Sequence, residues 1–238
     1  PSGLRNSACT FQRFIDTVLR GLDFTFGYID DVLVMSKNEA EHVEHLKILF
    51  ERLAEHGIKV GFDKCEFGKS EVDFLGYNIS AAGILPKKDK VETLLKLSSP
   101  KDYKTLRRTM GMLGFYRQHI PSFAQIAAPL HALLRETQPE TQTKKSPPFN
   151  WEEKHEKAFQ NLKNALANAV LLHFPSQQDQ SYTLTTDASG DAYGAALHVN
   201  RGGKSVPLAF YSKQFTPAQR KWSTFERELY GLYDSVKK

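Results

Sequence analysis

The chain has 238 residues, of which 40% are hydrophobic and 25% charged, so it contains enough apolar material for a sizeable core. No apolar run reaches about 18 residues, and no charged segment followed by an apolar one opens the chain, which argues against a membrane span and a secretory signal. Cys9 and Cys65 are the two cysteines. They make no disulfide framework and indicate free thiols in a reducing compartment.

The first part of the chain predicts a mixture of strands and helix. Residues 23–35 predict two short strands around a tight turn at Asp30-Asp31, because aromatic and β-branched residues flank two carboxylates that turns tolerate. A helix is predicted next, beginning with Ser36 and Glu39 at capping-box spacing and ending before Gly57. Further strands are expected at 58–62 and 71–79, turning near Ala82-Gly83.

From Lys87 the pattern becomes helical, and strands return near the end. Pro100 and Pro121 separate the helices, and a polar, proline-rich stretch at 136–148 indicates a linker. Gly202-Gly203 predicts a hairpin turn between the last two strands. The expected helices are 88–97, 102–118, 122–135, 151–168 and one from Ser223, and the expected strands are 181–187, 193–200 and 205–212.

The net charge of +5 is unevenly distributed along the chain. Residues 1–86 carry −4, residues 87–145 carry +7 and residues 146–238 carry +2. Such clustering is typical of a surface that binds a polyanion. A solvated helical face without a partner explains the charge equally well.

Two groups of carboxylates are candidates for metal chemistry. Asp30 and Asp31 are held close together at a turn, and a divalent cation such as Mg²⁺ would relieve their mutual repulsion. An ordinary surface turn is the simpler interpretation of that pair. Asp187 ends a predicted strand and Glu228 lies on a predicted helix, 41 residues further on, so spacing alone does not bring them together. Gly111 and Gly114, inside a helical pattern, indicate close helix packing rather than phosphate binding.

A series of short motifs resembles the Pol polyprotein of gypsy-type LTR retrotransposons, which is related to retroviral reverse transcriptase. Each motif is weak alone, and the full series in this order is very specific. The motifs are Pro1-Ser2-Gly3-Leu4-Arg5-Asn6, Thr10-Phe11-Gln12, Tyr28-Ile29-Asp30-Asp31, Lys64-Cys65-Glu66-Phe67, Phe74-Leu75-Gly76-Tyr77-Asn78-Ile79-Ser80, Leu106-Arg107-Arg108, Gly114-Phe115-Tyr116-Arg117, Thr186-Asp187-Ala188-Ser189 and Phe225-Glu226-Arg227-Glu228-Leu229.

The resemblance implies an α+β fold with four parts. We expect the C-terminal part of a polymerase palm at 1–86, a helical thumb with its linker at 87–148 and a connection at 149–180. The N-terminal part of a ribonuclease H-like α/β domain would follow at 181–238.

The resemblance also implies roles for individual residues. Asp30 and Asp31 match the metal-binding catalytic pair of the polymerase, and Asp187 and Glu228 match two metal ligands of the nuclease. Lys64 matches a lysine near the nucleotide's leaving pyrophosphate. The expected nucleic-acid contacts are Tyr28 beside the primer end, Gln12 below the template, Phe74, Leu75 and Gly76 in the primer-gripping hairpin, and Arg107 and Arg108 on the thumb.

The implied chemistry is two-metal catalysis with Mg²⁺, or with Mn²⁺ in its place. At the first site a primer 3′-hydroxyl attacks a dNTP, and at the second site water cuts the RNA strand of an RNA–DNA hybrid. The implied partners are an RNA template, a DNA primer, the RNA–DNA hybrid and dNTP, with no membrane, and a homodimer is left open. We expect an intracellular, non-secreted protein, located in a cytoplasmic particle or in the nucleus.

The chain departs from the family pattern in ways that bear on activity. The first polymerase aspartate of the family would precede Pro1, and further nuclease acids would follow Lys238, so we expect a fragment that is inactive by itself. Ser2 and Ser7-Ala8-Cys9 replace the residues usual in the opening motif, including a proline. The alternative is therefore a retrotransposon-derived remnant that binds nucleic acid without catalysis. An intron-type or telomere-type polymerase is disfavoured, because those lack a ribonuclease domain after the thumb.

Overall fold

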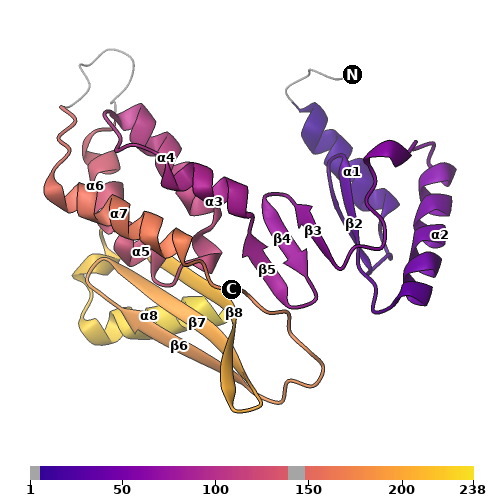
Figure 1. Ribbon diagram of the computed structural model, residues 1–238. Coiled ribbons are helices and arrows are strands. Elements are labelled where there is room, and N and C mark those ends of the chain that lie inside the picture. Colours follow the sequence, from indigo (N-terminus) through magenta and orange to yellow (C-terminus); the bar gives the residue numbers. More distant parts are fainter. Residues whose placement is uncertain (1–5, 139–147) are drawn as a thin grey trace. The chain divides into compact units, whose positions relative to one another are not determined.

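The computed structural model describes residues 6–138 and 148–238, and the chain divides into two compact units, Pro1–Ser70 and Glu71–Lys238. Both units mix helices with antiparallel strands, which confirms the α+β class (Figure 1). Within the described ranges, none of the helices combines the length and apolar character needed to cross a bilayer. The predicted linker at 136–148 lies mostly outside the described residues.

The first unit is a hairpin packed against two helices. Its elements are α1 (Ser7–Val18), β1 (Thr25–Tyr28), β2 (Asp31–Val34), α2 (Glu39–Glu55) and the 3-10 helix η1 (Phe62–Lys64). The apolar stripes of α1 and α2 meet the inner face of the hairpin in one core. The buried members of that core are Ile15, Val18, Leu19, Leu22, Leu49 and Leu53.

The C-terminal end of α2 was predicted correctly from the sequence, and its N-terminal cap was not. Gly57, at a φ of +70°, terminates the helix as predicted, and the Ile58 N–H donates to the Leu53 carbonyl at 2.9 Å. The capping prediction was wrong, because Asn38 is the N-cap and accepts from the Glu41 N–H. The predicted strand at 58–62 was also wrong. Ile58 and Val60 pack on the core without a pairing strand, and η1 follows.

The second unit contains a three-stranded hairpin sheet, a helical bundle and a second three-stranded sheet. The strands of the first sheet are β3 (Glu71–Phe74), β4 (Tyr77–Ser80) and β5 (Gly83–Pro86). The bundle contains α3 (Lys88–Leu95), α4 (Tyr103–Phe115), η2 (Arg117–His119), α5 (Phe123–Ile126), α6 (Ala128–Glu136) and α7 (Glu153–Ala167). The second sheet, β6 (Tyr182–Ala188), β7 (Ala192–Arg201) and β8 (Lys204–Gln214), is followed by η3 (Gln219–Lys221) and α8 (Thr224–Val236).

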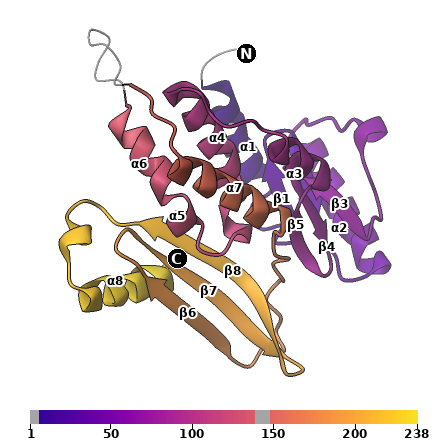
Figure 2. The same ribbon diagram turned by 60° about the vertical axis from the view of Figure 1, so that its left-hand side comes forward.

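The bundle and the second sheet pack together within this unit. Leu106, Leu113, Leu130, Phe159 and Leu166 are among the fully buried side chains of the bundle core. Helix α5 contacts β7 and β8, whereas α8 contacts β6 and β7, so the sheet lies between the bundle and α8 (Figures 1 and 2).

Two predicted elements of the second unit are each split in two. The predicted strand 71–79 is a hairpin, because the turn Leu75-Gly76 reverses the chain between β3 and β4. The predicted helix 122–135 breaks between α5 and α6, where Pro129 occupies the first turn of α6 and provides no N–H to continue the preceding helix. The Gly202-Gly203 turn between β7 and β8 is confirmed, with φ values of +59° and +79°.

Candidate functional sites

The β1–β2 hairpin presents the first pair of carboxylates. Tyr28 pairs with Asp31, so their side chains share a face of the hairpin, and both are exposed. Gly27 faces the opposite way, onto α1. A Cβ there would lie 2.5 Å from a methyl group of Leu19 and 2.8 Å from one of Ile15. The hairpin therefore packs directly on α1, and this contact fixes the distance between α1 and the end of the hairpin that carries the carboxylates.

The tight turn lies one residue earlier than predicted. Because Tyr28 pairs with Asp31, the turn residues are Ile29 and Asp30, and Asp31 begins β2. Ile29 has a φ of +51°, which is rare for a β-branched residue. Turn propensities point to the two aspartates instead, and this explains the shift.

Gln12 of α1 contacts the hairpin, and its place below the template stays a prediction. Its Oε1 accepts from the Ile29 N–H at 2.6 Å, and its Nε2 donates to the Gly27 carbonyl at 3.0 Å. No hydrogen bond or ion pair joins Lys64 to Asp30 or Asp31 within the described residues. Lys64 ends η1, whose Phe62 packs edge-on against Phe50 of α2.

The donor chemistry of the hairpin suits a hard divalent cation. Among the described residues, the carboxylates of Asp30 and Asp31 have no hydrogen-bonding or ion-pairing partner, and both residues are exposed. Mg²⁺ prefers such oxygen donors and keeps part of its water shell. No cluster of three or more His, Cys, Asp or Glu side chains suited to a metal occurs in the described part of the chain. Asp30 and Asp31 can therefore supply part of a metal site.

The β3–β4 hairpin and α4 form a continuous surface in the second unit. Tyr77 donates its hydroxyl to the Phe115 carbonyl at 3.0 Å and stacks on the Phe115 ring, while Tyr116 donates to the Gly76 carbonyl at 3.2 Å. Burial raises the pKa of Tyr77 to about 12, so its hydroxyl remains a donor at neutral pH. Leu75, at a φ of +49°, and Gly76, at +84°, form the turn that this contact holds.

One face of α4 carries the predicted arginines together with Phe115, which lies beside that turn. Arg107 and Arg108 are exposed, and spacings of three, four and seven residues place Lys104, Gly111 and Phe115 on the same face. We call Lys104, Arg107, Arg108, Gly111 and Phe115 the α4 stripe. The opposite face carries the buried residues Leu106, Thr109, Met110 and Leu113.

The packing role predicted for Gly111 is wrong. A Cβ at Gly111 would meet nothing within 4 Å, although the residue lies inside a helix where glycine is unfavourable. Gly114 has only an ordinary contact, since a Cβ there would lie 4.0 Å from Phe123. Packing within the protein therefore does not explain the glycine in the α4 stripe.

Glu228, of the second pair of carboxylates, reaches the backbone at the end of β6. Glu228 of α8 accepts from the Ala188 N–H through Oε1 at 3.3 Å, directly beside Asp187. The fold thus brings Glu228 to the residue after Asp187, although sequence spacing left the two apart. Asp187 is exposed, and its carboxylate has no hydrogen-bonding or ion-pairing partner in the described part of the chain. Asp187 and Glu228 also provide the hard oxygen donors that Mg²⁺ prefers.

Asp187 faces the helical bundle rather than α8. It pairs with Gly194, where a Cβ would lie 3.1 Å from the Gln125 amide of α5. The neighbouring Tyr193 points the other way, because a Cβ at Gly231 of α8 would lie 3.2 Å from it. Asp187 therefore lies on the face of the sheet that α5 covers in part.

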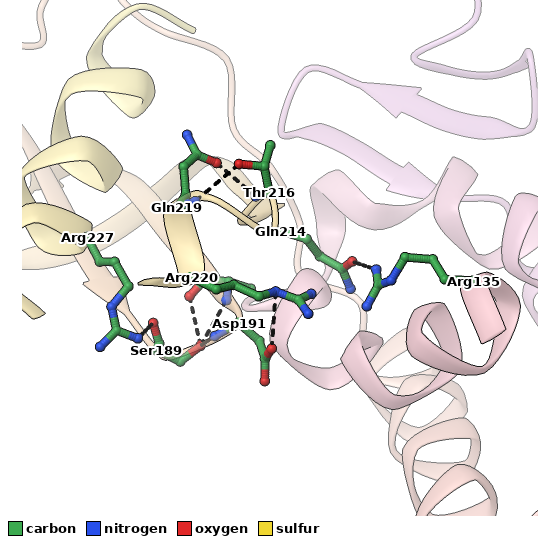
Figure 3. A network of polar contacts seen from close by, with 9 residues as sticks. Arg135, Ser189, Asp191, Gln214, Thr216, Gln219, Arg220 and Arg227 are labelled. Carbon is green, nitrogen blue, oxygen red and sulfur yellow. Dashed lines mark hydrogen bonds and ion pairs between the residues drawn. The ribbon is translucent and has the colours of Figure 1, made fainter. Parts of the chain in front are cut away.

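Polar contacts hold the loop that follows Asp187 (Figure 3). Arg227 donates to the Ser189 carbonyl at 2.8 Å, and Arg220 lies 3.4 Å from Asp191. On the bundle side, Arg135 of α6 donates to the Gln214 side chain at 2.9 Å. No local sequence signal points to the contacts of Arg227 and Arg135, since each joins distant segments of the chain.

Comparisons with known proteins match two parts of the chain. Residues 1–79 match the family described as reverse transcriptase (RNA-dependent DNA polymerase). Residues 151–238 match the RNase H-like domain found in reverse transcriptase.

Curated relatives match along the whole chain. It is 33% identical over 240 residues to the retrovirus-related Pol polyprotein from transposon 297 of Drosophila melanogaster, covering 100% of this chain and 21% of that protein. It is 33% identical over 241 residues to the transposon Tf2-3 polyprotein of Schizosaccharomyces pombe, covering 100% of this chain and 17% of that protein. The chain thus spans about a fifth of the length of these relatives.

Solved structures share the fold. The foamy viral protease-reverse transcriptase dRH in complex with double-stranded DNA aligns with a TM-score of 0.81 at 24% identity, covering 100% of this chain and 40% of that chain. The foamy viral protease-reverse transcriptase in complex with RNA/DNA hybrid aligns with a TM-score of 0.78 at 24% identity, covering 100% of this chain and 31% of that chain.

Proposed function

Because the chain belongs to the reverse transcriptase and RNase H-like part of gypsy-type retrotransposon Pol polyproteins, we propose that it contributes to two metal-dependent reactions on nucleic acids. The first is RNA-directed DNA synthesis at Asp30 and Asp31. The second is hydrolysis of the RNA strand of an RNA–DNA hybrid at Asp187 and Glu228. The observation that carries the proposal is that each matched segment presents carboxylates at the end of a strand, with Glu228 brought to the strand of Asp187 from a distant helix.

In the first reaction the hairpin residues bind and orient. Asp30 and Asp31 would hold Mg²⁺, or Mn²⁺ in its place, and Tyr28 would contact the primer end from the face it shares with Asp31. Lys64 would neutralise charge on the phosphates of the incoming dNTP. Bound divalent cations lower the barrier to attack by the primer 3′-hydroxyl, stabilise the leaving pyrophosphate and, at the second site, activate the water that cuts RNA.

In the second reaction Asp187 and Glu228 would hold the cations and orient the scissile phosphate. The Ala188 N–H fixes one Glu228 oxygen and leaves the other available to a ligand. Arg227 holds the carbonyl of Ser189, so the chain after Asp187 keeps a defined path. The position of the second pair therefore rests on backbone contacts.

The α4 stripe and the Leu75-Gly76 turn, with the neighbouring Phe74, would bind the duplex of template and primer. Arg107 and Arg108 provide charge for phosphates, and exposed Phe115 provides an apolar surface. Recognition by these groups would follow the shape and backbone of an RNA–DNA hybrid rather than its sequence. The foamy viral structures contain double-stranded DNA and RNA/DNA hybrid, which supports this choice of partner.

We place the action of the protein inside the cell, in a cytoplasmic particle or the nucleus, and leave its homodimerisation open. The second candidate function is binding of nucleic acid without catalysis. The exposed Arg107 and Arg108 would support such binding without any metal.

Mapping of Mn²⁺ by NMR decides between the two functions. In the 238-residue chain, Mn²⁺ should broaden the amide signals around residues 28–32 and 186–190. D30N/D31N should abolish only the first effect and D187N/E228Q only the second. Fluorescence anisotropy with a labelled RNA–DNA hybrid measures binding alongside. Hybrid binding without broadening at either site would overturn the catalytic proposal in favour of the remnant.

A further inference from the structure

The turn that carries Asp30 is strained. Ile29 has a φ of +51°, in the left-handed region that β-branched residues avoid, and such strain persists only where surrounding contacts impose it. The strained residue immediately precedes the two carboxylates of the first site. A contact that holds Ile29 therefore also determines where those carboxylates point.

The amide of Gln12 makes that contact on both sides of Tyr28. It accepts from the Ile29 N–H at 2.6 Å and donates to the Gly27 carbonyl at 3.0 Å. These two backbone groups lie two residues apart, so they point to the same edge of β1, away from β2. A single side chain thus takes the place of a neighbouring strand at the end of the hairpin.

Gln12 also has a partner on its own helix. Its Nε2 also donates to the Asp16 carboxylate at 2.8 Å, one helical turn further along α1. Ile15 of the same helix and Leu19, directly after its end, pack under Gly27 and allow no side chain there. The helix, the amide and the hairpin therefore form one rigid connection.

We propose that Gln12 is a positioning residue, which holds the Ile29-Asp30 turn and thereby orients Asp30 and Asp31 for metal binding. The proposal rests on the proposed function because it assumes that Asp30 and Asp31 bind a metal. It assigns to Gln12 a role in the protein's own active-site geometry, beside the position below the template that the resemblance implies. Glutamine fits this role because it both donates and accepts at the required reach.

Substitutions of Gln12 separate the two hydrogen bonds. Q12L removes both, while Q12E keeps an acceptor for Ile29 and loses the donor to Gly27. D16A is the matched control, since it removes a partner of Gln12 on α1 and leaves both bonds to the hairpin. Amide hydrogen exchange of Ile29, measured by NMR in the 238-residue chain, reports the bond to Oε1 directly.

We expect Q12L to speed exchange at Ile29 about twofold to twelvefold, the range for loss of one hydrogen bond, while the α2 amides exchange as in the unmodified chain. The Mn²⁺ concentration that half-broadens the signals of residues 28–32 should rise by a similar factor. Q12E should retain most of the protection at Ile29, and D16A should change neither quantity.

Unchanged exchange at Ile29 in Q12L would overturn the positioning role. Faster exchange with unchanged Mn²⁺ affinity would show that Gln12 supports the turn without orienting the carboxylates, and would also overturn the proposal. If the unmodified chain shows no broadening at residues 28–32, the proposed metal site itself is wrong. That result is distinguishable from the other two because it appears without any substitution.

Discussion

Gly111 offers a test in which protein stability and nucleic-acid binding should change in opposite directions. A Cβ at this exposed position meets nothing within 4 Å, so G111A gains helix propensity without a clash. The gain is about 1 kcal/mol in the free energy of unfolding, or roughly 2–4 °C in the Tm of a unit of this size. If a nucleic-acid backbone approaches α4 here, the added methyl group obstructs it. A clash of about 1–3 kcal/mol corresponds to a Kd roughly 5- to 150-fold higher for an RNA–DNA hybrid.

Gly114 provides the matched control on the same helix. A Cβ there reaches only an ordinary contact of 4.0 Å with Phe123, so G114A should gain a similar propensity without disturbing the α4 stripe. Urea unfolding measures the stability of each variant, and fluorescence anisotropy measures hybrid binding. Equal hybrid affinities of G111A and G114A would refute the idea that the glycine admits a nucleic acid, whatever their stabilities.

Three further predictions address charge, backbone and pH. R107Q/R108Q should weaken hybrid binding and reduce the slope of log Kd against log salt by about 2, or about 1 for each phosphate that an arginine no longer neutralises. G83A should destabilise the protein by about 3 kcal/mol or more in urea unfolding, because φ is +145° and a Cβ would lie 2.1 Å from the Leu172 carbonyl oxygen. The Arg201 guanidinium holds the pKa of Asp179 at about 2. Ionised Asp179 therefore stabilises the fold above pH 4, this contribution is lost as the pH falls from about 4 to 2, and D179N should lack that part of the acid transition.

Each of these predictions has a control and a contrary outcome. K157Q removes an exposed charge from α7 and should leave the salt slope unchanged, so an equal effect would point to general charge rather than the α4 stripe. G68A has positive φ without any contact within 4 Å, and should cost about 1 kcal/mol. Equal losses of stability in G83A and G68A would show that the contact with Leu172 is unimportant. An acid transition of D179N that parallels that of the unmodified chain would contradict the role of Asp179.

Where a glycine determines the end of a helix or a turn, the sequence predicted that end correctly. Gly57 ended α2 and Gly202-Gly203 closed the β7–β8 hairpin, because a positive φ at a chain reversal favours glycine. The same reasoning missed the Ile29-Asp30 turn, since tertiary contact with α1 imposes its backbone on an unfavourable residue. It also placed a strand at 58–62, where apolar residues pack on the core without a partner to pair with.

Sequence motifs predicted which residues belong to the candidate sites. They did not predict which contacts those residues make in the fold. Asp30 and Asp31 are adjacent in sequence, so their proximity was never in question. Glu228 reaches Ala188 only because the fold packs α8 against β6, which no local pattern specifies. The contacts that Gln12 and Arg227 make around them were missed for the same reason, since the hairpin partners of Gln12 and the loop partner of Arg227 lie 15 or more residues away.

Both pairs of carboxylates depend on backbone anchoring rather than on charge pairing. Gln12 holds the turn beside Asp30 through the Ile29 N–H, and Glu228 is held by the Ala188 N–H beside Asp187. Asp30, Asp31 and Asp187 have no ion-pairing partner in the described part of the chain. By contrast, the structural carboxylate of Asp179 is bound by Arg201 in two hydrogen bonds. A carboxylate that a cation must bind cannot already be neutralised by an arginine. The proposed metal chemistry at these two sites would require this combination of an anchored backbone and an unpaired carboxylate.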